Sequence, residues 1–441
     1  MTSSTPKHNI FWFRRDLRLN DNHGLFQALQ SGLPVKPIFI FDREILDKLD
    51  NPQDRRVLFI HQTLAGIKQK LQSHGSDLWV YYGNPERIWT ELVTTGNVEN
   101  IYSNKDYEPY AIQRDERIKG LCTTHGVGFH QFKDQVVFEC AEVVKDDGLP
   151  YTVYTPYSKR WKAQFKPEML NPYSSESLSQ HFLQEKSNPM PTLLEMGFEE
   201  TPFHFPESKP DEEIIKAYAE QRDIPSVRGT TRMSVHLRFG TISIRKLAQT
   251  AMKLSEKYLN ELIWREFYMQ ILWHFPRVVK ESFKPKYDRI EWRNNTDDFD
   301  KWCKGQTGYP IVDAGMRELL ATGFMHNRVR MIVASFLTKH LLIDWRWGEA
   351  WFARHLLDFE LASNNGGWQW AAGSGVDAAP YFRVFNPHLQ TLKFDPECKY
   401  IKQWVPEWNS LQYARPVIEH EVARKRCLAV YQKAVGPESA A

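Results

Sequence analysis

Residues 358–387 concentrate side chains that could hold a flat ligand. The segment also contains a Gly-Gly pair, and its polar and aromatic members include Asp358, Glu360, Asn364, Asn365, Trp368 and Trp370. Glycine lets a backbone approach a ligand closely, and tryptophan offers a face for stacking. We therefore predict that this segment forms the floor of a cofactor pocket. The alternative is a buried loop whose amides bond to backbone groups.

Two predicted helices each carry polar or sulfur-containing side chains along one face. Spacings of three, four and seven residues place on one stripe Glu261, Trp264, Arg265 and Tyr268, and on the other Asn327, Arg330, Met331 and Ala334. A carboxylate, an indole and a guanidinium together are not typical of a core face. A domain-interface stripe would explain the first helix, and core packing of methionine the second. Together with residues 358–387, they predict the walls of one site.

Residues 228–234 (RGTTRMS) precede a predicted helix that begins near Ser234. Hydroxyls and free backbone N–H groups at a helix N-terminus can bind phosphate. The alternative is an ordinary N-cap without a ligand.

Tryptophan is concentrated in the second half of the chain. Eleven of the 15 tryptophans fall between Trp264 and Trp408, which indicates an aromatic core or a site that uses rings for stacking or electron transfer. Three of them, Trp292, Trp345 and Trp368, lie far apart in sequence, so spacing does not show whether they meet.

Composition limits the class of protein. A chain of 441 residues with 42% hydrophobic content predicts two domains or one large composite. The net charge of +3 does not indicate a nucleic-acid binder, but residues 206–441 carry 34 basic against 28 acidic side chains, so a polyanion should bind there. Five scattered cysteines without a CxxC pair predict reduced thiols and no metal site. Without a signal pattern or a membrane-length apolar run, we expect a soluble cytoplasmic protein.

Strand and helix patterns alternate through residues 1–135. Short apolar runs predict strands at residues 9–14, 35–41, 77–82, 99–103 and 127–132, and the clearest helical pattern between them runs from Val57 to Leu71. This order predicts a parallel sheet with helices on both faces. No GxGxxG motif follows the first strand, so a nucleotide site of the dehydrogenase kind is not supported.

Periodicity fades after this region and returns as helices. Prolines interrupt residues 136–205, which predicts a long connector. Helices are predicted at residues 211–222, 234–256, 258–274, 298–304, 310–321, 326–341, 348–356 and 417–434. We therefore expect an α/β domain at 1–135, a connector at 136–205 and a larger all-helical domain at 206–441.

Five motifs resemble those of the photolyase/cryptochrome family. They are WFRRDLRLNDN, ELIWREFY, GYPIVDAGMREL, MHNRVRM and NNGGWQWAAGSGVDAAPYFRVFNP, and the likeness extends over nearly the whole chain. It is strongest to bacterial members that repair cyclobutane pyrimidine dimers. The resemblance implies a doubly wound, Rossmann-like antenna domain followed by a helical domain that binds FAD and DNA. It also implies light-driven repair, by electron transfer from photoexcited reduced FAD to a flipped-out dimer.

The resemblance implies which residues bind FAD. They are Tyr218, Thr230, Thr231, Arg232, Met233, Ser234, Tyr258, Arg330, Asp358, Glu360 and Asn364. Arg330 and Asp358 resemble the charge pair beside the isoalloxazine, and Asn364 resembles the residue that faces flavin N5. A neutral amide there tolerates an anionic reduced flavin, whereas a carboxylate would repel it. The family commonly has Asp-x-Asp where this chain has Asp358-Phe359-Glu360, so the second carboxylate reaches one methylene further.

The resemblance also assigns residues to the DNA substrate and to electron transfer. The residues expected to act on the dimer are Glu261, Asn327 and Met331, together with Asn364. The 6-4 repair subgroup has histidines at the positions of Asn327 and Met331. Stacking on the dimer is expected from Trp264 and Trp370. The remaining DNA contacts are expected from Arg222, Arg265, Arg328, Arg383 and Gln390. Trp368, Trp345 and Trp292 resemble a chain of indoles that passes electrons to oxidised flavin.

Two other functions remain open. A cryptochrome-type blue-light sensor would bind FAD without repairing DNA, although the short C-terminal tail, Asn364 and Met331 favour repair. A flavin-binding relative without any light function is the second. Residues 107–111 lack the Asn-Glu pair associated with folate binding, so the antenna could be a folate, a deazaflavin, another flavin or absent. We expect a monomer that binds dimer-containing DNA, with no obligate protein partner.

Overall fold

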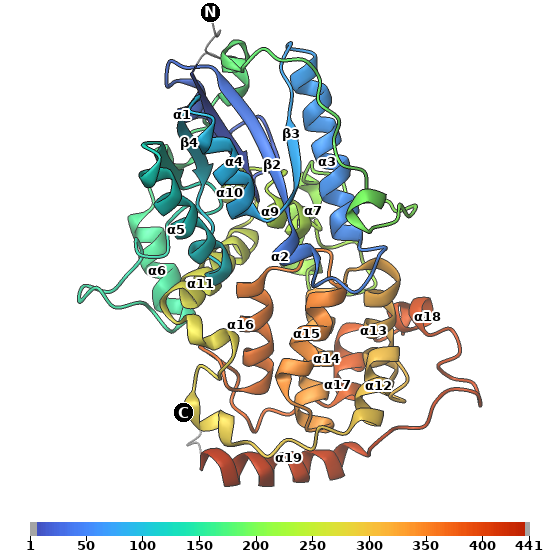
Figure 1. Cartoon of the computed structure of the whole chain (residues 1–441). Helices are drawn as coiled ribbons and strands as arrows, with labels where there is room; N and C mark the ends of the chain where they lie inside the picture. The colour runs from blue at the N-terminus through green and yellow to red at the C-terminus, as the bar shows by residue number, and fades with distance from the viewer. Residues whose placement is uncertain (1–6, 437–441) are drawn as a thin grey trace, which may run out of the picture. The chain divides into compact units, whose positions relative to one another are not determined.

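The computed structural model describes residues 7–436 (Figure 1). The chain forms two compact units, each built from stretches that alternate along the sequence. The first unit takes the chain up to residue 139 together with 165–210 and 232–250. The second, helical unit takes 140–164, 211–231 and the chain from 251 onward.

A five-stranded parallel sheet forms the centre of the first unit. Its strands are β1 (His8–Phe13), β2 (Val35–Asp42), β3 (Trp79–Gly83), β4 (Val98–Asn104) and β5 (Gly128–Phe132). They pair in the order β3-β2-β1-β4-β5, and every pair is parallel. The predicted fold class is therefore confirmed, and each of the five predicted strands is present.

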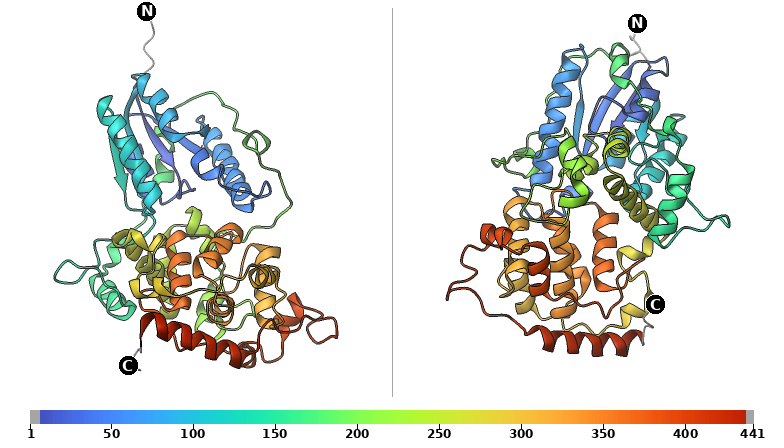
Figure 2. Two further views of the ribbon diagram at one scale, coloured as in Figure 1. Left: turned by 60° about the horizontal axis from the view of Figure 1, so that its bottom comes forward. Right: turned by 180° about the vertical axis from the view of Figure 1, so that it is seen from behind.

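Apolar side chains alternate between the two faces of this sheet, as the pleat requires. On one face, Ile10, Trp12 and Ile40 pack with Trp89 of α4 (Pro85–Thr94) and Ile118 of α5 (Pro109–Thr124). The other face is covered by α1 (His23–Leu29) and α3 (Arg55–Gln72): Gly24 of α1 lies against the Phe11 ring, and the His61 ring of α3 lies 6.4 Å from Phe41. Helices thus lie on both faces (Figure 2).

Buried polar groups lie where β1 and β4 end. Asn104 Nδ2 donates to Asp16 Oδ2 at 2.6 Å and to Asn22 Oδ1 at 2.7 Å, and Arg14 pairs with Asp115 at 2.5 Å. Burial raises the pKa of Asp16. The strand order reverses at this point, which is where open parallel sheets usually bind nucleotides. Here the protein's own charges and amides satisfy one another.

The helical unit contains the α-helices that carry most of the predicted site. They are α6 (Tyr154–Gln164), α7 (Glu212–Lys216), α8 (Tyr218–Gln221), α11 (Glu256–His274), α12 (Thr296–Lys304), α13 (Pro310–Thr322), α14 (Asn327–Ser335), α15 (Trp345–His355), α16 (Leu361–Ala372), α17 (Pro387–Phe394), α18 (Lys399–Trp404) and α19 (His420–Val435). Their main core includes Trp302, Phe336, Trp345 and Trp368.

Three predicted helices are interrupted. Residues 211–222 form α7 and α8, separated at Ala217, whose ψ of 6° is not helical. Residues 234–256 form α9 (Ser234–Phe239) and α10 (Ile244–Leu254), because Gly240 adopts a left-handed φ of 66° and its Cα approaches the Arg15 backbone too closely for a side chain. Residues 326–341 continue from α14 into a π-helical turn, Phe336–His340.

Helices α6 and α16 to α18 were not predicted. In α6 only Tyr157 and Trp161 are fully buried, so its apolar period is too weak to detect. Among the described residues, no helix is both long and apolar enough to cross a membrane.

Candidate functional site

Residues 361–372 of the predicted pocket floor fold as helix α16, which contacts α11, α14 and α15, and residues 373–386 are irregular (Figure 1). The helix begins after Glu360 and ends at Gly373, whose φ of 89° requires glycine. Its buried face carries Asn364 and Trp368. The stripes on α11 and α14 and residues 358–372 therefore meet in one helical unit, and residues 361–372 are a helix and not the loop of the alternative interpretation.

The two neighbouring amides of α16 have different partners. Asn364 Nδ2 donates to Glu349 Oε1 at 2.9 Å and to the Glu349 carbonyl at 3.1 Å. Asn365 instead donates to the Val278 carbonyl at 3.0 Å. Burial raises the pKa of Glu349. Asn365 therefore satisfies a backbone group, whereas Asn364 is held by a carboxyl group on α15, and no group within residues 7–436 donates to its Oδ1.

Two ion pairs join the carboxylates before α16 to the neighbouring helices. Arg330 of α14 donates to both oxygens of Asp358, at 3.0 and 3.1 Å. Arg265 of α11 pairs with Glu360 at 2.9 Å, and these two side chains are only 10% and 7% exposed. The longer Glu360 side chain thus binds a buried guanidinium.

A chain of charged groups crosses from α11 to α14. Arg222 donates to Glu261, and Arg328 donates to Asp223 Oδ1 at 2.9 Å. The guanidinium of Arg222 lies 3.8 Å from the same Asp223 oxygen. Arg328 also lies 3.6 Å from the Met331 sulfur. Four predicted substrate residues are therefore linked through Asp223, which the sequence did not single out.

The Trp264 indole is half-buried and has a stacking partner. The Tyr154 ring of α6 lies 3.7 Å from it with an interplanar angle of 4°, and the Tyr154 hydroxyl donates to the Asn260 carbonyl at 2.9 Å. Tyr268 lies 5.5 Å from Trp264 and packs against Gly366 of α16 so tightly that a Cβ there would approach it to 2.2 Å. Trp264 is thus held rigidly, with one face covered.

The three predicted electron carriers share one aromatic region. Trp345 and Trp368 are buried members of the main helical core, and Trp292 packs against that core and meets Tyr431 edge-on at 6.0 Å. Gly348, one turn after Trp345, allows the Trp368 ring to lie against α15, because a Cβ there would be 2.1 Å from that ring.

The segment predicted to bind phosphate, residues 228–234, is divided between the two units along the sequence. In the helical unit, Thr231 Oγ1 lies 2.8 Å from the Tyr258 hydroxyl, and the Tyr218 ring lies 5.0 Å from that of Tyr258. Arg232, Met233 and Ser234 lie in the first unit, where Ser234 begins α9.

The remaining predicted residues lie at the surface of the helical unit. Arg383 is exposed, its backbone carbonyl accepts a bond from the buried Lys339, and its guanidinium lies 5.5 Å from the Phe385 ring. Asn327, the first residue of α14, is also exposed, whereas Gln390 of α17 and Trp370 of α16 are half-buried.

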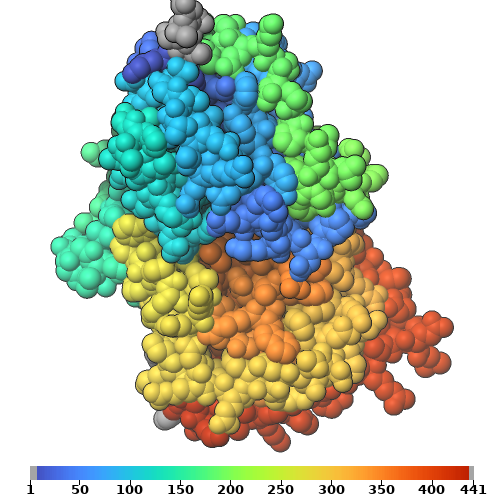
Figure 3. All heavy atoms as spheres, viewed as in Figure 1, coloured from blue at the N-terminus to red at the C-terminus, as the bar shows by residue number. Residues whose placement is uncertain are grey.

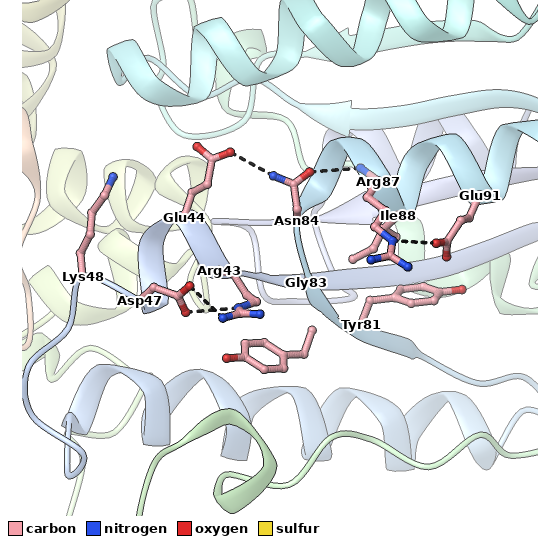
Figure 4. A pocket seen from close by; sticks show the side chains of 11 residues that line it. Arg43, Glu44, Asp47, Lys48, Tyr81, Gly83, Asn84, Arg87, Ile88 and Glu91 are labelled. Carbon is pink, nitrogen blue, oxygen red and sulfur yellow. Dashed lines mark hydrogen bonds and ion pairs between the residues drawn. The ribbon is translucent and has the colours of Figure 1, made fainter.

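The first unit contains a separate cavity of about 780 Å³, lined by residues at the end of β3 and in α2 (Arg43–Leu46) and α4. Arg43 and Asp47 pair at 3.2 Å, as do Arg87 and Glu91, and Tyr81 and Tyr82 supply aromatic rings (Figure 4). Figure 3 views the face on which α2 and α4 reach the surface.

Four contacts that shape the site were absent from the sequence reasoning: those of Tyr154, Asp223, Gly348 and Glu349. Glu349 lies one turn after the predicted carrier Trp345 on the same helix, which is the signal that could have identified it. Tyr154 lies in the proline-interrupted connector, and only the fold brings it to Trp264.

Comparisons with known proteins show the family to which the chain belongs. Residues 9–174 match the family described as "DNA photolyase", and residues 258–412 match "FAD binding domain of DNA photolyase". A deoxyribodipyrimidine photo-lyase of Halobacterium salinarum is 36% identical, with 97% of this chain and 100% of the relative covered. Two solved structures are also similar. A class III photolyase from Agrobacterium tumefaciens has a TM-score of 0.87 and 32% identity, covering 98% of each chain.

An archaeal photolyase from Sulfolobus tokodaii, solved with two FAD molecules, has a TM-score of 0.81 and 34% identity, covering 97% of this chain and 100% of that one. The sequence motifs, the parallel sheet, the helical unit and these full-length similarities together show that the chain belongs to the photolyase/cryptochrome family.

Proposed function

We propose that this chain is a deoxyribodipyrimidine photo-lyase that reverses cyclobutane pyrimidine dimers in DNA with light. The observation that carries the proposal is the meeting, in one helical unit, of the Asn364 amide held by Glu349 with the α11 and α14 stripes that carry Glu261 and Met331. A neutral amide beside a redox centre and a ring-lined recognition surface on the adjacent helices are what this reaction requires.

The side chains fit FAD by their chemistry. The hydroxyls of Thr230, Thr231 and Ser234, with Arg232 and Met233, would hold the phosphates and the adenine side, together with Tyr218 and Tyr258. The Arg330–Asp358 pair and Glu360 would bind the polar edge of the flavin and its ribityl chain, with donors and acceptors already paired and desolvated. When bound and reduced, FAD supplies absorption of blue or near-ultraviolet light and one-electron chemistry.

We propose that Asn364 sets the protonation of the cofactor at N5. Because its Nδ2 donates to Glu349, its Oδ1 can accept a bond from an N–H group and adds no negative charge. Burial raises the pKa of the neighbouring Glu349, so a negative charge on that carboxyl group is disfavoured as well.

On the substrate side, Trp264 and Trp370 would grip the flipped-out dimer by stacking. Tyr154 keeps one face of Trp264 covered, so a base would stack on the other. Glu261, which is well hydrogen-bonded to Arg222, would contact the dimer bases with Asn327 and Met331. A carboxylate accepts a bond from a base N–H, and a protonated carboxyl donates to a base carbonyl.

We propose that Arg222, Arg328, Arg383 and Gln390 contact the damaged strand. The burial of Arg265 against Glu360 favours a role in holding the flavin-side carboxylate over a direct DNA contact. Trp368, Trp345 and Trp292 would pass electrons to oxidised FAD, supported by their common aromatic core.

We further propose that residues 1–135 act as an antenna domain, 136–205 as a connector and 206–441 as the FAD- and DNA-binding part. The 780 Å³ cavity would take a second chromophore, because tyrosines and cations line it together. We place the protein in the cytoplasm as a monomer without an obligate protein partner.

The test is to illuminate the purified, reduced protein together with an oligonucleotide that contains one thymine dimer. The recovery of absorbance near the thymine band is measured during illumination. We expect light-dependent recovery for this dimer and none for a 6-4 photoproduct in the same sequence. If neither lesion is reversed while FAD is bound and photoreduced, repair is refuted and the sensor remains. An absorption spectrum before and after denaturation would identify any second chromophore.

A further inference from the structure

Two of the three guanidiniums proposed to contact the damaged strand are already neutralised by carboxylates of the helical unit. Arg222 bonds to Glu261, and both Arg222 and Arg328 approach the same oxygen of Asp223, at 3.8 and 2.9 Å. The four side chains carry two positive and two negative charges. A guanidinium that binds a carboxylate uses the same donors that it would offer to a phosphate.

The arginines are held in place by aromatic rings. The Arg328 guanidinium lies 4.3 Å from the centre of the Phe394 ring, and that of Arg222 lies 5.2 Å from the Tyr218 ring. Their side chains are only 18% and 15% exposed. Both guanidiniums are therefore preorganised, and neither needs to move far for an anion to reach it.

Asp223 is the most exposed member of the cluster. Its side chain is 42% exposed, against 31% for Glu261, and it lies in a turn after α8 rather than in a helix. A short side chain at a turn can rotate into water without leaving an unpaired charge in the interior. If Asp223 turned away, two fixed guanidiniums would face one vacant position suited to the oxygen pair of a phosphate.

We propose that Asp223 is an internal competitor for the DNA backbone: its carboxylate occupies Arg222 and Arg328 in the free protein and yields them to a phosphate when DNA binds. This deepens the proposed function and rests on the assignment of those arginines to DNA. Glu261 differs from Asp223, because a hydrogen bond to a dimer base can replace the bond that Glu261 loses when Arg222 binds a phosphate. Asp223 gains only water, so it lowers affinity for damaged and undamaged DNA alike and favours release of the repaired product.

The test is Asp223→Asn in the full-length protein with bound FAD, measured with duplexes that do or do not contain a thymine dimer. Both affinities should rise by a similar factor, up to about five-fold at low salt, because this factor corresponds to the free energy of one partly exposed ion pair. The gain should disappear near 1 M salt, where screening acts within about 3 Å. The repaired duplex should also dissociate more slowly.

Two further variants separate charge from structure. Asp223→Glu keeps the charge and should restore wild-type affinity. Asp300→Asn removes the same charge from α12, where Asp300 pairs with Lys304, and should change affinity by much less. If Asp223→Asn does not fold, as judged by its thermal transition, Asp223→Ser takes its place.

Unchanged or weaker DNA binding by the neutral variants would overturn the proposal, as would equal effects of Asp223→Asn and Asp223→Glu. The proposed function fails in a different way. If the wild-type protein does not prefer dimer-containing over undamaged DNA, the assignment of the site to dimers is wrong. If the wild-type protein does show that preference, but the neutral Asp223 variants bind DNA with the wild-type affinity, only the competitor role is wrong.

Discussion

A side chain at Gly348 should destabilise the protein, because the Trp368 ring occupies the space. A Cβ at this position would lie 2.1 Å from Cη2 and 2.4 Å from Cζ3 of Trp368, and 2.6 Å from Cδ2 of Leu337. The ring cannot move aside, since it is 2% exposed and packs against Phe352 at 5.0 Å and Trp302 at 6.0 Å. Overpacking of this kind costs about 1–3 kcal/mol.

The change Gly348→Ala also gains helix propensity, about 1 kcal/mol in a helix interior. The matched control is Gly367→Ala in α16, where no atom lies within 4 Å of the added Cβ, so only the propensity gain applies. We therefore expect the control to be more stable than Gly348→Ala by about 1–3 kcal/mol.

The assay is urea unfolding monitored by tryptophan fluorescence. The free energies of unfolding of the two variants are compared with the same dependence on urea concentration. Since the overpacked ring belongs to the first proposed electron carrier, Gly348→Ala should also slow photoreduction of oxidised FAD. If Gly348→Ala is as stable as Gly367→Ala and photoreduces at the wild-type rate, the packing of Trp368 on α15 is wrong.

Three further predictions concern the same helices. Burial lowers the pKa of His326, the N-cap of α14, to about 4, below its value in the unfolded chain, so its contribution to stability is complete above pH 6.5 and falls by about 3 kcal/mol as the pH drops to 4. Amide protection factors in α14, which are corrected for the intrinsic exchange rate at each pH, should fall over that range, and His326→Asn should abolish this pH dependence. Trp368→Phe should slow photoreduction yet leave repair by chemically reduced protein intact, and equal photoreduction rates would contradict the assigned path. Glu349→Leu leaves the Asn364 amide without its side-chain acceptor and should cost about 1–3 kcal/mol in urea unfolding, whereas Glu349→Gln should cost less than half of that.

The sheet could be predicted because its strands are short apolar runs between helical patterns. In β1, Ile10 and Trp12 are buried on one face of the sheet and Phe11 is buried on the other, so the apolar run is nearly continuous and easy to recognise. Helix α16 was missed for the opposite reason. It is buried around much of its circumference and rich in glycine and alanine, so it has no amphipathic period to detect.

The stripe on α11 was correct as geometry but incomplete as chemistry. Helical spacing places Glu261, Trp264 and Arg265 near one another, yet it does not reveal their partners. Glu261 binds Arg222, 39 residues before it, whereas Arg265 turns to Glu360, 95 residues after it. Tyr154 reaches Trp264 from 110 residues away. Such contacts depend on how helices pack, which local periodicity does not encode.

The proposed repair function requires that light convert a bound dimer into two intact pyrimidines. The measurement is chromatography with mass detection of a thymine-dimer oligonucleotide after one turnover on the reduced protein in blue light, with a dark sample alongside. We predict a strand of unchanged mass that elutes with the undamaged oligonucleotide, formed only in the light. Recovery of unaltered dimer, or of a cleaved strand, would contradict it.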